Sequence, residues 1–219
     1  MGDVRAAAAR VYKPGEMDYA PRIIGVDPAR FGDDRSVIVR RQGNVMFEPF
    51  VVQGIDNMQL AARVAGEINQ WKPHAVFIDS GAGAGVIDRL RQLGHDVIEV
   101  PFGGKASEPL LYKNRRTEMW WLMAEWLRLG GSIPENPALM RELATPVYKY
   151  EPNGQRALEP KDKIKERLPG AGSPDIADAL ALTFADPVDP GVQDPTQRWQ
   201  LAEGARETYS YGEDFDPLA

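Results

Sequence analysis

Two short apolar runs in this chain each end in an aspartate, with a helical pattern between them. Residues 22–27 read RIIGVD and residues 75–79 read AVFID, and each run opens into a segment containing proline or glycine. Strands of this kind end at the edge of an α/β sheet where ligand sites form. One such aspartate is most simply a turn residue, but two at equivalent strand ends, Asp27 and Asp79, predict a shared site.

The remaining patterns complete the order of elements. Strands are expected over residues 36–40, 45–52 and 97–100, and a hairpin around residues 153–154. Helices are expected over residues 57–71 (after an N-cap at Asp56), 86–93, 115–129, 139–143 and 174–185. Hairpin-linked strands followed by alternating helices and strands predict a mixed five-stranded sheet with helices on both faces. This order matches the ribonuclease-H-like α/β architecture.

Two further acids lie at the start of the last expected helix, in the segment SPDIADAL. Ser173 is the expected N-cap and Pro174 the first helical residue. Asp175 follows in the first turn, where the helix dipole favours a negative charge. Asp178 lies three residues further on and on the same face. Because the surrounding residues are apolar, the helix is expected to be buried, and a carboxylate there needs a partner such as a divalent cation.

Composition narrows the chemistry that is available. The chain has 219 residues, no cysteine and only two histidines, His74 and His95. These counts exclude disulfides, cysteine-ligated metals and a cysteine nucleophile, and they leave little room for a histidine cluster or a Ser-His-Asp triad. Any chemistry must therefore rest on carboxylates and lysines.

Carboxylates from two strand ends and one helix suit a pair of hard divalent cations. We expect two Mg²⁺ or Mn²⁺ ions, about 3.5–4 Å apart, with all-oxygen ligands. The expected metal ligands are Asp27, Asp79, Asp175 and Asp178. The reaction implied is phosphodiester hydrolysis, in which one ion activates a water and the other stabilises the leaving 3′-oxygen.

Four segments in order resemble the C-terminal nuclease domain of bacteriophage terminase large subunits. They are GVDPARFGDDRSV, VFIDSGAGAGVIDRLRQLG, YKNRRTEMW followed by EWLRLGG, and KDKIKERLPGAGSPDIADALALTF, and together they span residues 22–185. The resemblance implies that Asp27, Asp79 and Asp175 bind the catalytic metals. It leaves Asp178 as a further ligand or a support.

Basic residues near these motifs are candidates for contacts with DNA. By resemblance, Lys161, Lys163 and Lys165 lie close to the acids and steady the scissile phosphate, although a solvated helix face is the favoured interpretation for any one of them. Contacts to the DNA backbone are expected from three arginines, Arg30, Arg115 and Arg116. The tryptophans of the long helix, Trp120, Trp121 and Trp126, are expected to pack in the core.

The glycine-rich segment after Asp79 is expected to form a tight turn beside the metal site. A dinucleotide motif, G-x-G-x-x-G, would need glycine at position 86, where the chain has Val86. We therefore interpret Gly81, Gly83 and Gly85 as turn residues.

The charge of −6 is unevenly distributed. Residues 187–219 contain seven acids and two bases, whereas residues 1–186 contain 25 acids and 24 bases. We expect an N-terminal extension (residues 1–20), a nuclease domain (residues 21–186) and an acidic, flexible tail (residues 187–219). The nearly neutral body predicts weak binding to DNA in isolation.

Partners follow from the resemblance. It implies double-stranded DNA, a terminase ATPase domain, the small terminase subunit and the portal, in the cytoplasm of an infected or lysogenic bacterial host. The chain has no G-x-x-x-x-G-K-[ST] phosphate loop, so it is not expected to drive packaging alone. Neither a membrane span nor a signal peptide is expected.

Other functions remain open at this point. A Holliday-junction-resolvase-like nuclease also fits, since that family shares the fold and a D-x-x-D-A-L segment on its last helix. A non-catalytic docking domain of the packaging machine is a second alternative, against which the intact set of acids argues. An actin-like sugar kinase lacks support, because the glycine-threonine phosphate loop expected after the first strand is missing.

Overall fold

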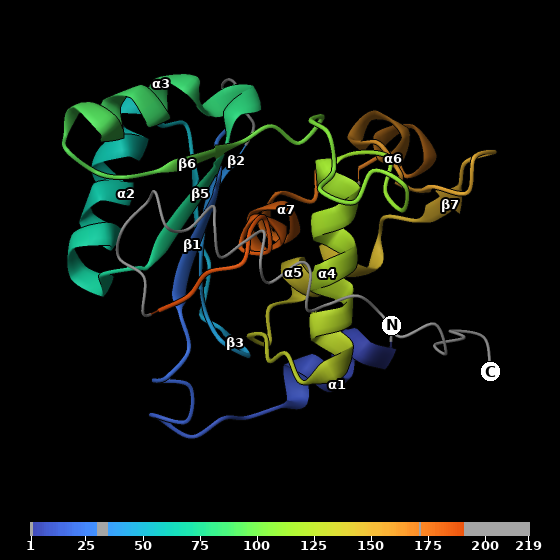
Figure 1. The fold of residues 1–219 in the computed structure, drawn as a ribbon, viewed down its shortest axis with the longest axis horizontal. Helices are drawn as coiled ribbons and strands as arrows, with labels where there is room; N and C mark the ends of the chain where they lie inside the picture. Colours follow the sequence, from blue (N-terminus) through green and yellow to red (C-terminus); the bar gives the residue numbers. More distant parts are fainter. Residues whose placement is uncertain (1, 30–34, 171, 191–219) are drawn as a thin grey trace.

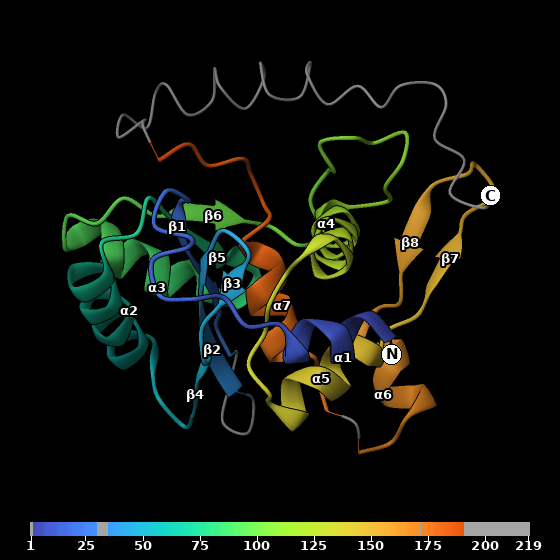
Figure 2. The ribbon, with the colours of Figure 1, turned by 90° about the horizontal axis from the view of Figure 1, so that it is seen from below.

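The computed structural model describes residues 2–29, 35–170 and 172–190, and within these residues a six-stranded mixed sheet is covered by helices on both faces (Figure 1). The strands of this sheet are β1 (Arg22–Asp27), β2 (Arg35–Gln42), β3 (Val45–Met46), β4 (Phe50–Gln53), β5 (Ala75–Asp79) and β6 (Ile98–Val100). The helices are α1 (Gly2–Ala9), α2 (Asn57–Trp71), α3 (Ser80–Gln92), α4 (Arg115–Leu129), α5 (Pro137–Ala144), α6 (Lys161–Arg167) and α7 (Asp175–Leu182). A separate hairpin, β7 (Tyr148–Tyr150) and β8 (Arg156–Leu158), extends beyond α4 (Figure 2).

The sheet has the strand order β3-β2-β1-β5-β6, and β4 also pairs with β2. β1 is antiparallel to β2 and parallel to β5, which is parallel to β6. The predicted mixed sheet between helices is therefore confirmed. The segment predicted as one strand over residues 45–52 pairs with β2 as two short strands, so the described sheet has six strands instead of five. Pro49 lies in the interruption, where it has no N–H to donate to a ladder.

The two faces of the sheet carry separate cores. Ile24 and Val26 pack in a cluster with α2 and α3, whereas Ile23 packs in a second cluster with α1, α4, α5 and α7. Because side chains alternate along a strand, Asp27 lies on the same face as Ile23. Phe77 of β5 belongs to that second cluster too, so Asp79 shares this face. The strands therefore direct both aspartates toward the side of the sheet that α7 covers.

Helix α7 lies directly on β1 and β2, and all eight of its residues are buried. Gly25 allows this approach, because a Cβ atom at that position would be 2.1 Å from the backbone oxygen of Ala179. The absence of a side chain at Gly25 thus sets how closely α7 packs on β1, the strand that ends in Asp27.

The glycine-rich segment after Asp79 is helical, and the predicted tight turn is wrong. Helix α3 begins at Ser80, so Gly81, Gly83 and Gly85 lie in its first turns. A Cβ atom on Gly83 would be 2.9 Å from the Pro28 ring, and one on Gly85 would be 2.7 Å from the Asn57 side chain. These glycines serve close packing of the helix against β1 and α2.

Helix α1 belongs to the segment predicted as an N-terminal extension, yet it packs on the body. Val4 and Ala7 are buried in the core beside α4 and α5. The Arg10 guanidinium also donates to the backbone oxygens of Leu127 (2.5 Å) and Gly131 (2.8 Å). The domain boundaries themselves stay predictions, and residues 191–219 of the expected tail lie outside the described residues.

The longest described helices, α2 and α4, have 15 residues each. A helix needs about 20 predominantly apolar residues to cross a bilayer. No described helix meets the length and hydropathy required of a membrane span.

Replacing Gly25 tests the contact between β1 and α7. We expect Gly25→Ala to lower the free energy of unfolding by about 3 kcal/mol, because the new methyl group has no room beneath the α7 backbone. Urea unfolding measures this loss. Gly66→Ala in α2 is the matched control: nothing lies within 4 Å of the new methyl group, so we expect a gain of about 0.5–1 kcal/mol. A Gly25→Ala variant as stable as the parent would contradict the close approach.

Candidate metal centre

Two adjacent parallel strands place Asp27 and Asp79 side by side. Val26 of β1 is level with Ile78 of β5, so the aspartates that follow them end their strands at the same height. Asp27 is 4% exposed, and Asp79 is half-buried. Asp79 is also the N-cap of α3, and its Oδ1 accepts from the Gly81 backbone N–H at 3.2 Å.

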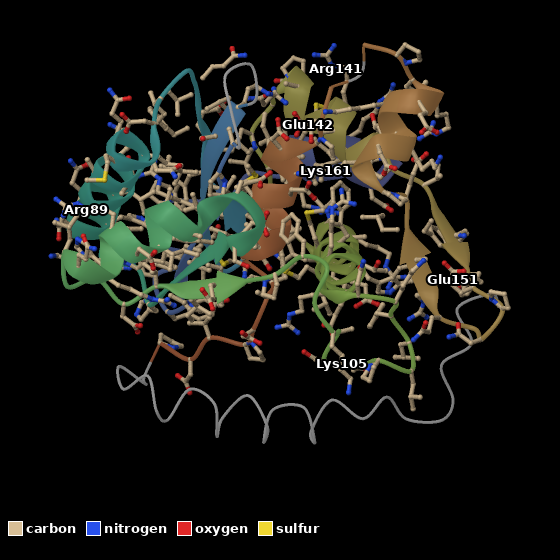
Figure 3. All side chains as sticks on the ribbon, turned by 90° about the horizontal axis from the view of Figure 1, so that it is seen from above. Arg89, Lys105, Arg141, Glu142, Glu151 and Lys161 are labelled. Carbon is tan, nitrogen blue, oxygen red and sulfur yellow. The ribbon has the colours of Figure 1, made fainter. Side chains whose placement is uncertain are left out.

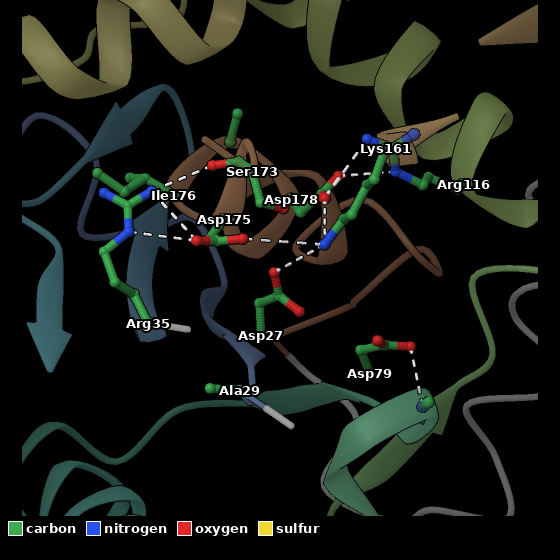
Figure 4. Close-up of polar contacts among 12 residues, drawn as sticks. Asp27, Ala29, Arg35, Asp79, Arg116, Lys161, Ser173, Asp175, Ile176 and Asp178 are labelled. Atoms are coloured by element: carbon green, nitrogen blue, oxygen red, sulfur yellow. Dashed lines mark hydrogen bonds and ion pairs between the residues drawn. The ribbon is translucent and has the colours of Figure 1, made fainter. Parts of the chain in front are cut away.

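Helix α7 adds Asp175 and Asp178 above Asp27. Both acids lie in its first turn, as predicted, with Asp175 8% exposed and Asp178 fully buried. The fold thus brings Asp27 together with Asp175 and Asp178, which follow it in the sequence by 148 and 151 residues. Asp79 lies beside them on β5 (Figure 4).

The Lys161 ammonium lies at the point where three carboxylates meet. Its Nζ is 2.8 Å from Asp178 Oδ2, 3.4 Å from Asp27 Oδ2 and 4.0 Å from Asp175 Oδ1. The side chain reaches this point from the first residue of α6 and is one-third exposed. Figure 3 shows Lys161 and Glu142 near the middle of the molecule, whereas Arg89 and Glu151 lie at its periphery.

The second oxygen of each α7 acid is held from behind. Arg35 donates to Asp175 Oδ2 from Nε (3.2 Å) and from an Nη (3.1 Å). Asp178 Oδ1 accepts from Arg116 Nε at 2.9 Å and from Trp120 Nε1 at 2.6 Å, and an Arg116 Nη also donates to Oδ2 at 3.4 Å. Each acid therefore has an outer oxygen bound to the scaffold and an inner oxygen facing Lys161 (Figure 4).

Burial and charge act in opposite directions on these acids. Burial raises the pKa of Asp27 well above its ordinary value, and the Asp178 and Asp175 charges add to that rise while Lys161 opposes it. Burial also raises the pKa of Asp79. Burial alone would raise the pKa of Asp178 as well, but Arg116 and Lys161 more than compensate and hold it below the ordinary value.

Lys161 is stabilised in its charged form. Burial acts against the ammonium, but the charges of Asp178 and Asp27 outweigh it and raise the pKa of Lys161 above its ordinary value. At neutral pH the lysine is therefore a cation among three carboxyl groups.

Two residues that the sequence reasoning missed support the start of α7. The predicted cap by Ser173, with Pro174 as the first helical residue, is wrong: the helix begins at Asp175, and its N-cap Pro174 makes no side-chain cap. Glu142 of α5 takes that role, since its Oε2 accepts from the Ile176 N–H (2.7 Å) and the Ala177 N–H (3.1 Å). Glu142 lies outside the four segments that resemble the terminase nuclease, and Arg35 lies within GVDPARFGDDRSV, where nothing in the local pattern assigned it a role.

The other predicted basic residues divide into three groups: two lie on the solvated side of α6, two are directed inward, and one lies outside the described residues. Lys163 pairs with Glu166 on the surface, and Lys165 is exposed, so both lie on the solvated side of α6. The remaining residues of the prediction are Arg115, Arg116 and Arg30.

Arg115 and Arg116 are directed inward onto acidic partners, and their contacts to DNA stay a prediction. Arg116 binds Asp178, and Arg115 pairs with Glu118 (2.8 Å) and Asp186 (2.6 Å). Their side chains are only 9% and 12% exposed. Arg30 lies outside the described residues. Trp120 packs in the core as predicted, and it adds the bond to Asp178.

The carboxylates fit a hard cation in chemistry, although a lysine takes that place here. Among the residues that the structure describes, no three acidic or histidine side chains form a ready-made metal cage. The inner oxygens of Asp27, Asp175 and Asp178 nevertheless surround one positive charge. Oxygen donors of this kind are those that Mg²⁺ and Mn²⁺ prefer, so withdrawal of Lys161 would leave a suitable donor set.

The raised pKa of Asp27 has a consequence for stability without metal. Above pH 3.8 the unfolded chain releases the Asp27 proton while the folded protein retains it. Stability therefore falls as the pH rises from 3.8 to the raised pKa, and the loss persists at higher pH. We expect Asp27→Asn, which carries no charge, to raise Tm at about pH 8, by about 2–4 °C for each kcal/mol recovered.

Thermal unfolding in chelator at several pH values measures this effect. The difference in Tm between Asp27→Asn and the parent should shrink as the pH falls toward 3.8, where both side chains are neutral. If the Tm of Asp27→Asn at about pH 8 is equal to or lower than that of the parent, burial of the Asp27 charge does not lower the stability of the fold.

Comparison with known proteins identifies the fold. No family model and no curated protein matches the chain. Among solved structures, a lysine-to-alanine variant of the large-terminase nuclease domain from bacterial virus Sf6, solved with manganese and β-thujaplicinol, is 19% identical with a TM-score of 0.74. That match covers 85% of this chain and 97% of that one.

Two nuclease domains from other phages are also similar. The large-terminase nuclease from thermophilic phage G20c with bound magnesium is 19% identical, with a TM-score of 0.58 over 81% of this chain and 85% of that one. The large-terminase nuclease domain of Thermus phage P74-26 is 17% identical, with a TM-score of 0.56 over 81% and 83%. The resemblance drawn from the sequence motifs is thus confirmed at the level of fold: this chain has the fold of a large-terminase nuclease domain.

Proposed function

We propose that this chain is a metal-dependent endonuclease that cleaves concatemeric double-stranded DNA as part of a phage packaging terminase. The observation that carries the proposal is the convergence of the inner oxygens of Asp27, Asp175 and Asp178 on one cationic point, beside Asp79, in this fold. Buried acids gathered in this way are expensive to maintain unless they bind a cation.

Four acids would hold the metal. Asp27 and Asp79 supply oxygens from the strand ends, and Asp175 and Asp178 supply their inner oxygens from α7. Two Mg²⁺ or Mn²⁺ ions bound there would activate a water and stabilise the leaving 3′-oxygen. Arg35 and Arg116 keep the outer oxygens of the α7 acids occupied, so that only one edge of each carboxylate faces the reacting phosphate.

Lys161 would change partners when substrate binds. Its ammonium lies on the acids in this structure, and one-third of the side chain remains exposed. Once the acids hold divalent cations, the ammonium is free to donate to a non-bridging oxygen of the scissile phosphate. The lysine would thereby offset the negative charge of the acids before catalysis and the negative charge of the phosphate during it.

The partners and setting of this activity belong to the same proposal. The double-stranded DNA would be delivered by a terminase ATPase domain together with the small subunit and portal, in the cytoplasm of the bacterial host. Residues 1–186 carry nearly equal numbers of acids and bases. Because a protein that binds DNA without partners relies on clustered basic residues, this balance supports dependence on the other packaging components.

Charge-neutral variants of the strand acids test the activity. We expect Asp27→Asn and Asp79→Asn to lower the rate of Mn²⁺-dependent plasmid nicking by about 1000-fold or more, because loss of a ligand removes several kcal/mol of metal-derived stabilisation. The matched control is Asp88→Asn on the exposed side of α3, which should cleave like the parent.

The substrate and the chelator distinguish the alternatives. Cleavage of linear duplex DNA at the same rate as four-way junctions, abolished by EDTA, is expected. Preference for junctions would favour the resolvase-like nuclease. Full cleavage by both aspartate variants would refute the metal centre, and no cleavage by the parent under any divalent metal would favour a docking domain.

A variant of the central lysine tests its competition with metal. We expect Lys161→Ala to bind Mn²⁺ roughly tenfold more tightly, a gain of about 1.4 kcal/mol, because the ammonium no longer occupies the inner oxygens. Cleavage should nevertheless slow, since the donor to the phosphate is lost. Titration calorimetry gives the affinity, with Lys163→Ala as the matched surface control. Weaker Mn²⁺ binding by Lys161→Ala would contradict competition.

A further inference from the structure

Glu142 connects the first turn of α7 to Arg35. One carboxylate oxygen, Oε2, accepts from the backbone N–H groups of Ile176 and Ala177. The other, Oε1, accepts from an Arg35 Nη at 2.9 Å. Glu142 is 7% exposed, and its side chain makes these hydrogen bonds to residues outside its own helix α5.

Arg35 extends this connection to Asp175. Its Nη that binds Glu142 also donates to the Ser173 backbone oxygen (3.1 Å), and its Nε and Nη both donate to Asp175 Oδ2. A guanidinium is planar and holds its donors in a fixed fork, so these bonds set the rotation of the carboxylate as well as its position. With Oδ2 held, Asp175 Oδ1 faces Lys161 and the centre of the site.

The sequence around α7 offers no substitute for these contacts. The N-cap residue is Pro174, which makes no side-chain cap, so the first N–H groups of the helix depend on Glu142. The backbone of Asp175 is therefore fixed from α5, and its side chain is fixed from β2.

The geometry points to Glu142 and Arg35 as a pair of positioning residues that set the orientation in which Asp175 binds metal. This inference rests on the proposed function. Neither residue touches the metal or the phosphate; each acts through the Asp175 carboxylate. Partners that orient a ligand in this way typically alter metal affinity by about 10–100-fold when they are replaced.

Charge and geometry make opposite predictions for Arg35. If only its positive charge mattered, its removal would favour a divalent cation nearby, and Arg35→Met would bind Mn²⁺ more tightly. Lysine would then replace arginine without effect. If the fork matters, both Arg35→Met and Arg35→Lys should bind Mn²⁺ more weakly, because lysine retains the charge but cannot make two fixed bonds to one oxygen.

Glu142→Gln separates positioning from helix capping. The amide oxygen can still accept from Ile176 and Ala177, so the start of α7 keeps its cap. The amide NH₂ then faces the Arg35 guanidinium, a donor against a donor, and the connection to Asp175 is lost. A purely structural role of Glu142 would leave metal affinity unchanged in this variant.

The experiment measures binding of Mn²⁺ alone, without DNA, by electron paramagnetic resonance of the free ion. We expect Arg35→Met, Arg35→Lys and Glu142→Gln each to weaken binding by about 10–100-fold. The double variant Arg35→Met/Glu142→Gln should lose no more than Arg35→Met alone, because both residues act through one carboxylate. Arg63→Gln, which breaks the ion pair between the exposed Arg63 side chain and Glu67 on α2, is the matched control and should bind as the parent does.

Asp27→Asn distinguishes failure of this inference from failure of the proposed function. If Asp27→Asn binds Mn²⁺ like the parent, the metal centre itself is refuted. If Asp27→Asn loses binding while Arg35→Lys and Glu142→Gln keep parental affinity, only the positioning role is refuted. Urea unfolding of each variant identifies folded samples, and Glu142→Gln keeps the inference testable should the Arg35 variants unfold.

Discussion

The contact between the Lys161 ammonium and three buried carboxylates is the interaction on which the centre of this protein depends. Asp27, Asp175 and Asp178 bring their inner oxygens within 4.0 Å of one nitrogen atom, where solvent is largely excluded. Negative charge packed so closely is unfavourable without a cation. Burial, and secondarily the neighbouring acids, raises the pKa of Asp27, whereas Arg116 and Lys161 hold the pKa of Asp178 below its ordinary value against burial. If the proposed metal centre forms, divalent cations would take over the role of this ammonium, which would link the stability of the metal-free protein to its proposed chemistry.

The placement of these acids comes from tertiary packing more than from the helix that carries two of them. Helix α7 has eight residues and no side-chain cap of its own, so in isolation it would be marginal. Its position is set by Gly25, which admits the helix backbone to β1, and by Glu142, which caps it from α5. Both contacts act within the first two turns, where Asp175 and Asp178 lie. Packing and the geometry of the proposed metal centre therefore share the same few residues, and a change in one alters the other.

The sequence was sufficient for the parts that depend on local pattern. The apolar runs ending in Asp27 and Asp79, the i+3 spacing of Asp175 and Asp178, and the order of the elements predict the sheet and bring the acids together. It was insufficient where long-range partners override local preference. Glycines that disfavour a helix begin α3 because Pro28 and Asn57 leave no room for side chains. Arg115 and Arg116, proposed as contacts to DNA, are directed inward because they bind Asp186 and Asp178, which lie 71 and 62 residues further along the chain. Arg35 meets Asp175 across 140 residues, and no pattern read along one segment reports such a contact.

The same burial changes the meaning of the acidic composition. Among the described residues, six acidic side chains are buried (Asp27, Glu67, Glu118, Glu142, Asp175 and Asp178) but only two basic ones (Arg41 and Arg116). Since residues 1–186 contain nearly equal numbers of acids and bases, removal of these groups to the interior leaves the outer surface of the body with a small basic excess. A polyanion approaching this surface meets less repulsion than the net charge of −6 implies. The excess is too small to hold DNA strongly by counterion release, so under the proposed function the attraction at the centre would come from cations bound to the acids. Metal binding and attraction of the phosphate backbone would then be coupled, because the acids repel DNA until bound cations reverse their charge.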